Sequence, residues 1–332
     1  MNDPGSMVQT DRLSPDEAGL ARAATLLRQG RLVAFPTETV YGLGADATDA
    51  SAVAGIYAAK DRPRFNPLIA HVDGLKAAQE QGVFEDAALR LADAFWPGPL
   101  TLVVPVAPGG TVCDLARAGL DSVGLRVPSH PVARALLSAV GRPVAAPSAN
   151  RSGRVSPTTA AHVLADLDGR IDAVLDGGSA DVGVESTIVA CLDGTIRLLR
   201  PGGVSREAIA QVIGGIGKVL TEDDNHADAP LAPGMLASHY APRARVRRDV
   251  AEIMPGEAAL LFGPMRPRHA ERAVASLNLS PTGDLREAAA ALFSALRALD
   301  QPGLATIAVA PIPEAGLGEA INDRLRRAAA ER

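Results

Sequence analysis

Cationic side chains gather where one apolar segment of this sequence ends and the next has not begun. The run Lys60-Asp61-Arg62-Pro63-Arg64 places three cations on a loop between an expected helix and an expected strand. Pro63 and Pro67 restrict this loop, so its cations can be held in place at a low cost in entropy. Lysine supplies a point charge and arginine a bidentate fork, which together suit a polyphosphate. A solvated basic loop is the alternative for such a run on its own.

A segment rich in hydroxyl groups and glycine follows the apolar stretch Leu32 to Phe35. It reads Thr37-Glu38-Thr39-Val40-Tyr41-Gly42-Leu43-Gly44 and can bring backbone N–H groups close to an anionic or polar ligand. An ordinary turn after a strand is the alternative on spacing alone. The sequence contains no Gly-x-x-x-x-Gly-Lys-[Ser/Thr] run, which excludes a P-loop ATPase.

Other polar residues lie at the ends of expected strands, where α/β proteins commonly place their ligand crevice. Arg126 ends one apolar run and suits a carboxylate, with a surface ion pair as the alternative. Ser148 and Asn150 end another run, although both types are also common in turns. Ser186 and Arg200 occupy similar positions where a strand meets a turn.

The segment Pro233 to Pro242 carries more interacting side chains than an inert spacer needs. It contains His239, Tyr240 and two prolines, so we expect it to fold over a site. A lone histidine is more often structural than catalytic, and we assign His239 no role in proton transfer.

Apolar segments of strand and helix length alternate through the first two thirds of the chain, which predicts an α/β domain with a large mixed sheet. A capping box at Ser14-Pro15-Asp16-Glu17 is expected to begin the first helix, and Gly30 to close it. The other expected helices are 51–60, 86–95, 131–140, 157–167 and 205–213. The expected strands are 32–35, 68–72, 101–106, 122–127, 143–147, 173–175, 186–190 and 196–199.

The chain of 332 residues is long enough for two domains. The acidic, aperiodic stretch Thr221 to Asp228 indicates a linker. We therefore predict a larger α/β domain at 14–216, a linker at 217–244 and a smaller α/β domain at 245–332. Strands 258–262 and 304–310 and helices 285–299 and 318–330 are expected in the smaller domain.

The composition excludes several classes of protein. A net charge of -5 gives no general attraction to nucleic acid, so no strong direct binding of RNA or DNA is expected. Cys113 and Cys191 lack the spacing of a disulfide framework or a zinc site. The polar start of the sequence does not suit a signal peptide, and no apolar run is long enough for a membrane span, so we expect a cytoplasmic location.

Taken in order, these segments resemble the threonylcarbamoyl-AMP synthase family in its long form, which has a YrdC-like catalytic domain. Thr37 to Gly44 is similar to the opening motif of the family, and Pro233 to Pro242 to its interdomain linker. Lys60-x-Arg62 and Ser148-x-Asn150 together resemble its catalytic tetrad.

The resemblance implies a YrdC-like mixed twisted sheet with a concave site, joined to a smaller Rossmann-like α/β domain. It implies an enzyme that makes threonylcarbamoyl-AMP from L-threonine, bicarbonate and ATP with Mg²⁺, and that holds no metal through the protein. Its four catalytic residues would be Lys60, Arg62, Ser148 and Asn150. These four would also bind ATP, together with Arg64, Asn66, Ser156, Arg200 and Tyr240. L-Threonine would contact Thr37, His71, Arg126 and Ser186.

The product would pass to a tRNA threonylcarbamoyltransferase complex for the modification of an adenosine. Two other readings stay open. One is a carbamoyl-adenylate-forming enzyme, whose relatives carry cysteine-rich zinc motifs that two cysteines cannot supply. The other is an RNA-binding module without catalytic activity.

Overall fold

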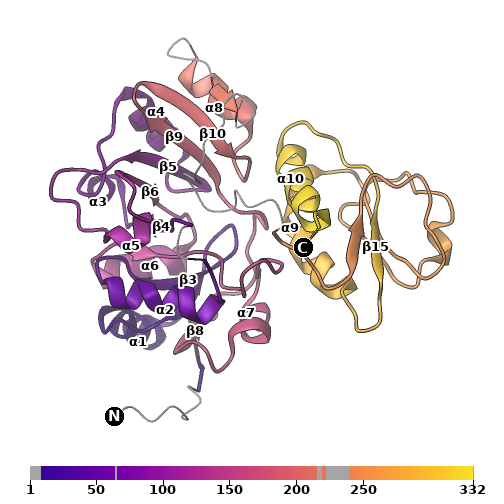
Figure 1. Ribbon diagram of the computed structural model, residues 1–332, viewed down its shortest axis with the longest axis horizontal. Helices are drawn as coiled ribbons and strands as arrows, with labels where there is room; N and C mark the ends of the chain where they lie inside the picture. Colours follow the sequence, from indigo (N-terminus) through magenta and orange to yellow (C-terminus); the bar gives the residue numbers. More distant parts are fainter. Residues whose placement is uncertain (1–8, 64–65, 215–218, 222–238, 332) are drawn as a thin grey trace.

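The chain folds around two separate sheets that lie side by side (Figure 1). The structure is a computed structural model that describes residues 9–63, 66–214, 219–221 and 239–331. Residues up to Thr221 form the larger unit, and residues from His239 onward form the smaller one. The expected mixed α/β architecture with a second, smaller α/β unit is confirmed.

The larger unit is built on an 11-stranded mixed sheet whose strand order crosses over repeatedly along the chain. Parallel and antiparallel pairs are mixed, so strands from distant parts of the sequence become neighbours. In spatial order the strands are β1 (Asp11–Leu13), β8 (Ala173–Leu175), β2 (Val33–Pro36), β3 (Tyr41–Asp46), β7 (Val144–Ala145), β4 (Ile69–His71), β6 (Ser122–Arg126), β5 (Leu100–Pro105), β9 (Thr187–Leu192), β10 (Thr195–Arg200) and β11 (Val219–Thr221).

Helices cover both faces of this sheet. On β2, Val33 and Phe35 pack into one hydrophobic cluster while Ala34 packs into another, as alternation along a strand requires. None of the helices in the described residues is long and apolar enough to cross a bilayer. The helices are α1 (Glu17–Arg28), α2 (Ala50–Lys60), α3 (Leu75–Gln79), α4 (Asp86–Phe95), α5 (Asp114–Arg117), α6 (Pro131–Val140), α7 (Ala160–Leu167) and α8 (Arg206–Ile213).

The start of α1 differs from the expected capping box. Asp16, rather than Ser14, is the N-cap, and its Oδ1 accepts a hydrogen bond from the backbone N–H of Gly19 at 2.8 Å. Pro15 therefore precedes the cap and does not occupy the first helical turn. The prediction of Ser14 as the N-cap was wrong because Asp16, two residues later, accepts the hydrogen bond from the first helical turn.

Strand β3 is the main element that the sequence did not reveal. Its two glycines lower strand propensity, so the sequence predicts no strand there. In the structure it forms an antiparallel hairpin with β2, and the turn is Thr37 to Val40. The glycines serve close packing: a Cβ on Gly44 would lie 2.9 Å from Cε1 of Phe35.

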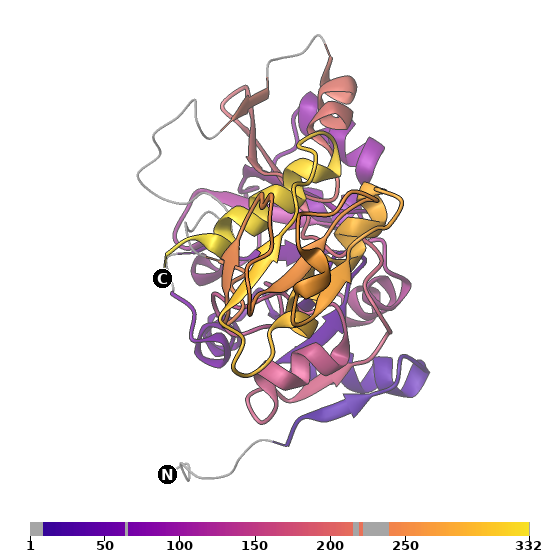
Figure 2. The same ribbon diagram turned by 90° about the vertical axis from the view of Figure 1, so that its right-hand side faces the viewer.

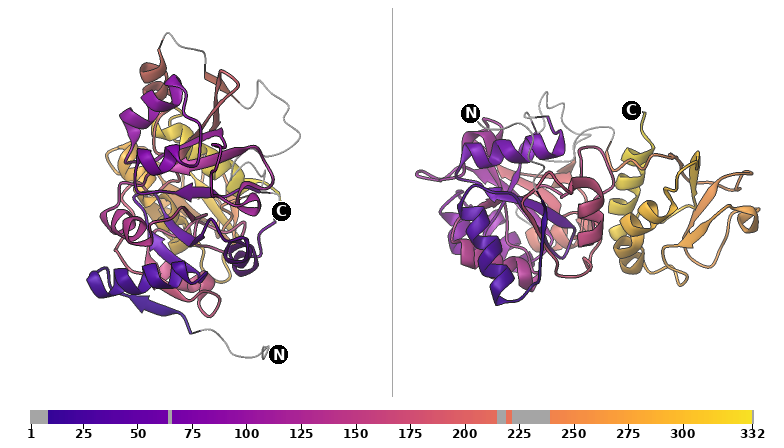
Figure 3. Two further views of the ribbon diagram at one scale, coloured as in Figure 1. Left: turned by 90° about the vertical axis from the view of Figure 1, so that its left-hand side faces the viewer. Right: turned by 90° about the horizontal axis from the view of Figure 1, so that it is seen from below.

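The smaller unit holds a parallel sheet of four strands in the order β12-β15-β13-β14. Its two long helices lie on the side that faces the larger unit (Figures 1 and 3). Figure 2 looks onto this unit with the larger sheet behind it. Its elements are β12 (Arg245–Arg247), β13 (Ala258–Leu261), η2 (Ala270–Arg272), β14 (Ser276–Asn278), α9 (Leu285–Leu299), β15 (Thr306–Val309) and α10 (Leu317–Ala329).

The range predicted as linker, 217–244, contains the short strand β11, and β12 begins directly after it. Strand β11 pairs in parallel with β10 at the edge of the large sheet, and β12 pairs with β15 in the smaller one. The acidic stretch from Glu222 to Asp228 lies outside the described residues. Strands β1, β11, β12 and β14 have three residues each and mix polar with apolar types, so the sequence predicts no strand there.

The two units share one hydrophobic cluster. Val40, Val155 and Val184 of the larger unit belong to the same cluster as Leu292 and Phe293 of α9. Two polar contacts join the same surfaces. Thr158 Oγ1 lies 2.8 Å from Ser294 Oγ, and Arg297 Nη2 donates to Asp166 Oδ2 at 2.7 Å. The units are therefore packed together along α9.

Gly183 lies against α9 in this contact, with no room for a side chain. Its φ is +74°, and a Cβ built on it would lie 2.3 Å from the carbonyl oxygen of Ala289.

We predict that Gly183→Ala lowers the free energy of unfolding by about 2–4 kcal/mol, since strain at positive φ adds to overpacking against backbone. Thermal unfolding measures the change. Gly178→Ala is the matched control: its φ is +86° with nothing within 4 Å of the added Cβ, so it reports the strain of positive φ alone. Equal losses in both variants would contradict the packing argument.

Candidate functional site

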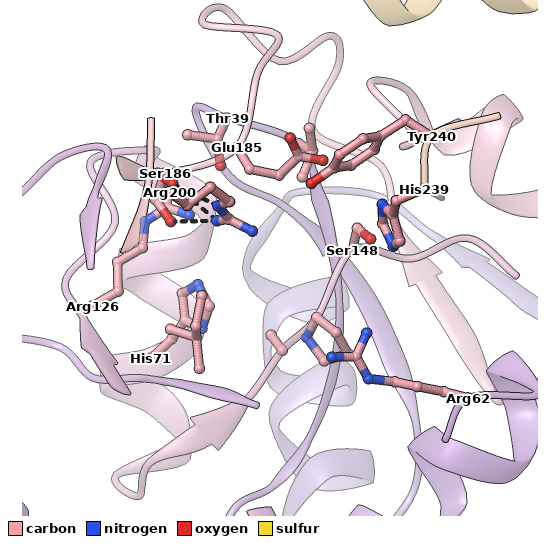
Figure 4. Close-up of a pocket in the computed structure, with 14 residues that line it drawn as sticks. Thr39, Arg62, His71, Arg126, Ser148, Glu185, Ser186, Arg200, His239 and Tyr240 are labelled. Atoms are coloured by element: carbon pink, nitrogen blue, oxygen red, sulfur yellow. Dashed lines mark hydrogen bonds between the residues drawn. The ribbon is translucent and has the colours of Figure 1, made fainter. Parts of the chain in front are cut away.

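A pocket opens where β4, β6 and β10 end and β9 begins, close to the loop after β7 (Figure 4). In this conformation its cavity volume is about 50 Å³, room for about one or two water molecules. Its lining residues are Thr39, Val40, Arg62, Ile69, His71, Arg126, Ala146, Pro147, Ser148, Glu185, Ser186, Arg200, His239 and Tyr240.

The structure brings most of the predicted site residues together. Seven of them line the pocket: Arg62, His71, Arg126, Ser148, Ser186, Arg200 and Tyr240. Five others are buried but are not part of this lining: Thr37, Lys60, Asn66, Asn150 and Ser156. Arg64 lies outside the described residues, so its role in ATP binding stays a prediction.

Lys60 supports the loop that carries Ser148 and Asn150. Its side chain is 1% exposed, and its ammonium group donates hydrogen bonds to the carbonyl oxygens of both residues. Burial and the positive charge of Arg62 hold the pKa of Lys60 well below its usual value. Strand β3 holds the other side of this loop, since Leu43 N–H donates to Pro147 O at 2.7 Å. The Lys60 side chain therefore lies behind Ser148 and holds its loop in place.

Arg62 and Arg200 bring two guanidinium groups to the same pocket from distant segments (Figure 4). Arg62 Nη2 donates to Pro67 O at 3.3 Å, and its buried Nε has no hydrogen-bond partner in the part of the chain described. Burial lowers the pKa of Arg62 to about 10, so the side chain stays charged near neutral pH. Arg200 donates through Nε and Nη2 to Ser186 O at 3.1 and 2.9 Å.

Arg126 lines the pocket and forms a buried ion pair with Glu38. Its Nη2 donates to Glu38 Oε1 at 2.5 Å, and the second oxygen of Glu38 accepts from the backbone N–H of Ser129 at 3.0 Å. Burial alone would raise the pKa of Glu38, but the charge and hydrogen bond of Arg126 offset it and the pKa is lowered. Glu38 belongs to the Thr37 to Gly44 motif, but the sequence predicts no role for its side chain. Its contact with Arg126 fixes the guanidinium that faces the pocket.

The hydroxyl group of Thr37 is used within its own turn. Thr37 Oγ1 donates to Val40 O at 2.6 Å and lies 2.8 Å from Thr39 Oγ1. Thr39 and Val40 line the pocket in its place. The resemblance assigns Thr37 to L-threonine, whereas the structure places the hydroxyl-bearing Thr39, two residues later, in the pocket lining.

Glu185 is a carboxylate in the pocket wall that the sequence did not single out. Its Oε1 accepts a hydrogen bond from Ser156 Oγ at 2.5 Å, so the hydroxyl group of Ser156 is directed at Glu185. Its Oε2 accepts from Arg324 Nε at 2.8 Å, which comes from the smaller unit. Burial alone would raise the pKa of Glu185, but the charges of Arg324 and Arg200 offset this and the pKa is lowered.

Tyr240 covers one side of the pocket. It is 1% exposed, its ring stacks on Phe293 of α9 with centroids 5.6 Å apart, and His239 meets it edge-on at 4.1 Å. Its φ of +60° is unusual for a tyrosine and is held by these contacts. The rest of the predicted motif, Pro233 to Ser238, lies outside the described residues. His239 is buried, and burial together with nearby cations lowers its pKa well below the usual value, which keeps the ring neutral.

The charges of this pocket suit an anionic ligand. Arg62, Arg126 and Arg200 line it, against a single lining carboxylate, Glu185, in the described part of the chain. Guanidinium groups fixed by carbonyl and carboxylate acceptors can bind phosphate or carboxylate oxygens without reorganising. Fold and site together define a two-unit α/β protein with a buried pocket lined by three guanidinium groups.

Comparison with known families agrees with this description. A family model described as telomere recombination matches residues 25–202, and one described as the threonylcarbamoyl-AMP synthase C-terminal domain matches residues 204–330. The chain belongs to the threonylcarbamoyl-AMP synthase family, which the sequence motifs had suggested.

Named relatives are similar over nearly the whole chain. The threonylcarbamoyl-AMP synthase of Bacillus subtilis (strain 168) is 41% identical over 339 residues, which cover 97% of this chain and 96% of that protein. The synthase of Pyrococcus abyssi is also 41% identical, over 93% of this chain and 94% of that protein. The crystal structure of P. abyssi Sua5 complexed with L-threonine has a TM-score of 0.86 and 36% identity, and the match covers 96% of this chain and 97% of that one.

His71 provides a test of the electrostatics at this site. It is buried, and burial together with the charge of Arg126 lowers its pKa to about 3. The unfolded chain binds a proton at this histidine near pH 6.5 and the folded chain does not, so stability is lost as the pH falls below 6.5. Between pH 7 and pH 5 we expect wild type to lose about 2 kcal/mol more of its free energy of unfolding than His71→Gln.

Urea unfolding of both proteins at the two pH values makes this measurement. The other histidines are present in both proteins, so their contributions cancel in the difference. The same loss in both proteins would mean that His71 is protonated in the folded state.

Proposed function

We propose that this chain is an L-threonylcarbamoyladenylate synthase. It would convert L-threonine, bicarbonate and ATP to threonylcarbamoyl-AMP, diphosphate and water. The observation that carries the proposal is the convergence of Arg62, Arg126 and Arg200 on one pocket, in a chain that belongs to the threonylcarbamoyl-AMP synthase family. The complex of the P. abyssi relative with L-threonine supports the amino acid as substrate.

The reaction brings anions together. The amine of threonine takes up carbon dioxide from bicarbonate to give a carbamate, with loss of water. A carbamate oxygen then attacks the α-phosphorus of ATP, and the bond from this phosphorus to the bridging oxygen breaks as diphosphate leaves. Carbamate and triphosphate repel each other strongly in a pocket of low dielectric, so fixed cations are needed before the chemistry begins.

The pocket offers two cationic sides for these anions. We propose that Arg126, held by Glu38, binds the threonine carboxylate, with His71 and Ser186 nearby and the Thr37 to Val40 turn completing the subsite. Arg62, Ser148 and Arg200 would bind the phosphates, supported by Lys60, Asn66, Asn150 and Ser156 behind them. Arg64 is proposed for the same side from its position in the motif.

Magnesium is expected to arrive on the triphosphate as part of the substrate. The charged groups of this pocket are mainly guanidinium groups, which bind phosphate oxygens and not a metal. Both oxygens of Glu185 already accept hydrogen bonds. We therefore propose that Mg²⁺ is coordinated mainly by phosphate oxygens and neutralises part of their charge.

Substrate entry requires the pocket to widen. A cavity of about 50 Å³ is far below the roughly 300–1,000 Å³ of typical ligand sites. Tyr240 and His239 directly follow the segment that joins the two units and line the pocket, so this wall opens only when Tyr240 leaves its contact with Phe293. We propose that Tyr240 and His239 close over bound nucleotide and exclude water, because carbamates and mixed anhydrides hydrolyse readily.

Downstream, the product would be taken up by a tRNA threonylcarbamoyltransferase complex in the cytoplasm. The net charge of -5 gives this chain no general affinity for tRNA, which fits a soluble intermediate passed between enzymes.

Release of diphosphate tests the proposed reaction. We expect release from Mg-ATP only when both L-threonine and bicarbonate are supplied, with threonylcarbamoyl-AMP as the product in mass spectrometry. Release with carbamoyl phosphate in place of threonine and bicarbonate would favour carbamoyl-adenylate formation. Salt-dependent binding of RNA without any turnover would favour a binding module.

Lys60→Ala is expected to lower turnover about 100- to 1,000-fold, as for removal of one preorganised group at a transition state. The variant releases the two carbonyl groups that Lys60 holds and that position Ser148 and Asn150. Steady-state kinetics with saturating substrates measure the effect. Lys76→Ala, on the exposed part of α3, is the matched control. A near-normal rate for Lys60→Ala would remove Lys60 from the catalytic machinery.

A further inference from the structure

Arg324 is a charged residue of the smaller unit that the proposed reaction does not yet use. It lies on α10, and its side chain is 0% exposed. A buried charge is costly unless it is paired and hydrogen-bonded, so its contacts indicate what it does.

The guanidinium group of Arg324 joins three acceptors, two of which lie on the larger unit. Nε donates to Glu185 Oε2 at 2.8 Å, and Nη1 donates to Pro201 O at 2.8 Å. Nη1 also donates to Asp323 Oδ2, and Arg326 and Arg327 of the same helix approach the other oxygen, Oδ1. Arg324 therefore clamps the segments on either side of the β9–β10 hairpin, which carry Glu185 and Pro201.

Glu185 is the group in this contact that matters for the pocket. It is the single carboxylate among the lining residues of the described chain, and the phosphates of ATP are proposed to bind beside it. Ser156 and Arg324 each donate a hydrogen bond to one of its two oxygens. Without Arg324, a buried negative charge would face a triphosphate, and a buried carboxylate that loses its partner is strongly unfavourable.

Tyr240 provides an independent link between Arg324 and the pocket. Arg324 Cζ lies 5.3 Å from the centroid of the Tyr240 ring, within the range of a cation–π contact. Phe293 of α9 stacks on the same ring. The residue that covers the pocket is thus held by two helices of the smaller unit.

We propose that Arg324 is a positioning residue through which the smaller unit neutralises Glu185 and so makes the pocket competent to bind the triphosphate of ATP. This assignment rests on the proposed function, and it gives the smaller unit a part in nucleotide binding.

Four variants of the full-length chain test it: Arg324→Met, Glu185→Gln, the double variant, and Arg326→Met as the matched control. Methionine keeps the length of the aliphatic stem against Tyr240 and removes the charge. Arg326 lies on the same helix with a side chain that is 60% exposed, so its substitution makes the same charge change away from the pocket. The readouts are the Kd for Mg-ATP by calorimetry, the KM values for ATP and L-threonine, and the temperature of unfolding.

We expect Arg324→Met to weaken Mg-ATP binding about tenfold or more, with the KM for L-threonine changed less than about threefold. The double variant is expected to recover Mg-ATP binding to within about threefold of wild type, since it no longer buries an unpaired carboxylate. A role in packing alone predicts no recovery, so a double variant as weak as Arg324→Met overturns the proposal. Unchanged Mg-ATP binding in Arg324→Met overturns it as well.

If Arg324→Met does not fold, the double variant decides the matter. Recovery of folding and of Mg-ATP binding supports the proposal, and a loss of tenfold or more overturns it. Formation of threonylcarbamoyl-AMP by wild type is measured in parallel. Its absence would refute the proposed reaction, whereas the Kd for Mg-ATP still reports separately on Arg324.

Discussion

The structure depends on placing several positive charges in one buried pocket. Arg62, Arg126 and Arg200 repel each other there, and burial makes each charge more costly. The protein offsets this cost with fixed acceptors: backbone carbonyl groups for Arg62 and Arg200, and Glu38 for Arg126. Because these acceptors are part of the sheet and its loops, the cations are in position before any ligand arrives.

The mixed topology of the large sheet makes this arrangement possible. Adjacent strands β4 and β6 bring His71 and Arg126 into register as direct neighbours, although the residues are far apart in the chain. Strands β9 and β10 form a hairpin whose open end carries Ser186 and Arg200. A purely sequential arrangement of strands would scatter these groups. The crossover connections gather them at one place.

The sequence predicted the architecture better than the individual contacts. Long amphipathic segments such as α4, α6 and α9 show their period clearly, and their bounds agree with those expected. Strand β3 was missed because its glycines, which allow close packing against Phe35, look like turn residues. Motif positions indicated which residues belong to the site, and the structure places most of them around one pocket.

Contacts across the fold could not be read from the sequence. Nothing near Lys60 shows that its ammonium group binds the carbonyl groups of residues about ninety positions later. The pairing of Glu38 with Arg126, and of Glu185 with Arg324, depends equally on tertiary packing. Such partners have no periodicity and no local spacing, so they appear only once the strands are assembled.

The shared hydrophobic cluster sets a limit on how this protein can be shortened. Val40, Val155 and Val184 are covered by α9 and its neighbours, and Val40 also borders the pocket. An engineered version that keeps only the first 216 residues would expose these three valines to water and promote aggregation. A minimal catalyst built from this scaffold would therefore need polar replacements at Val155 and Val184, while Val40 would have to remain apolar to preserve the shape of the site.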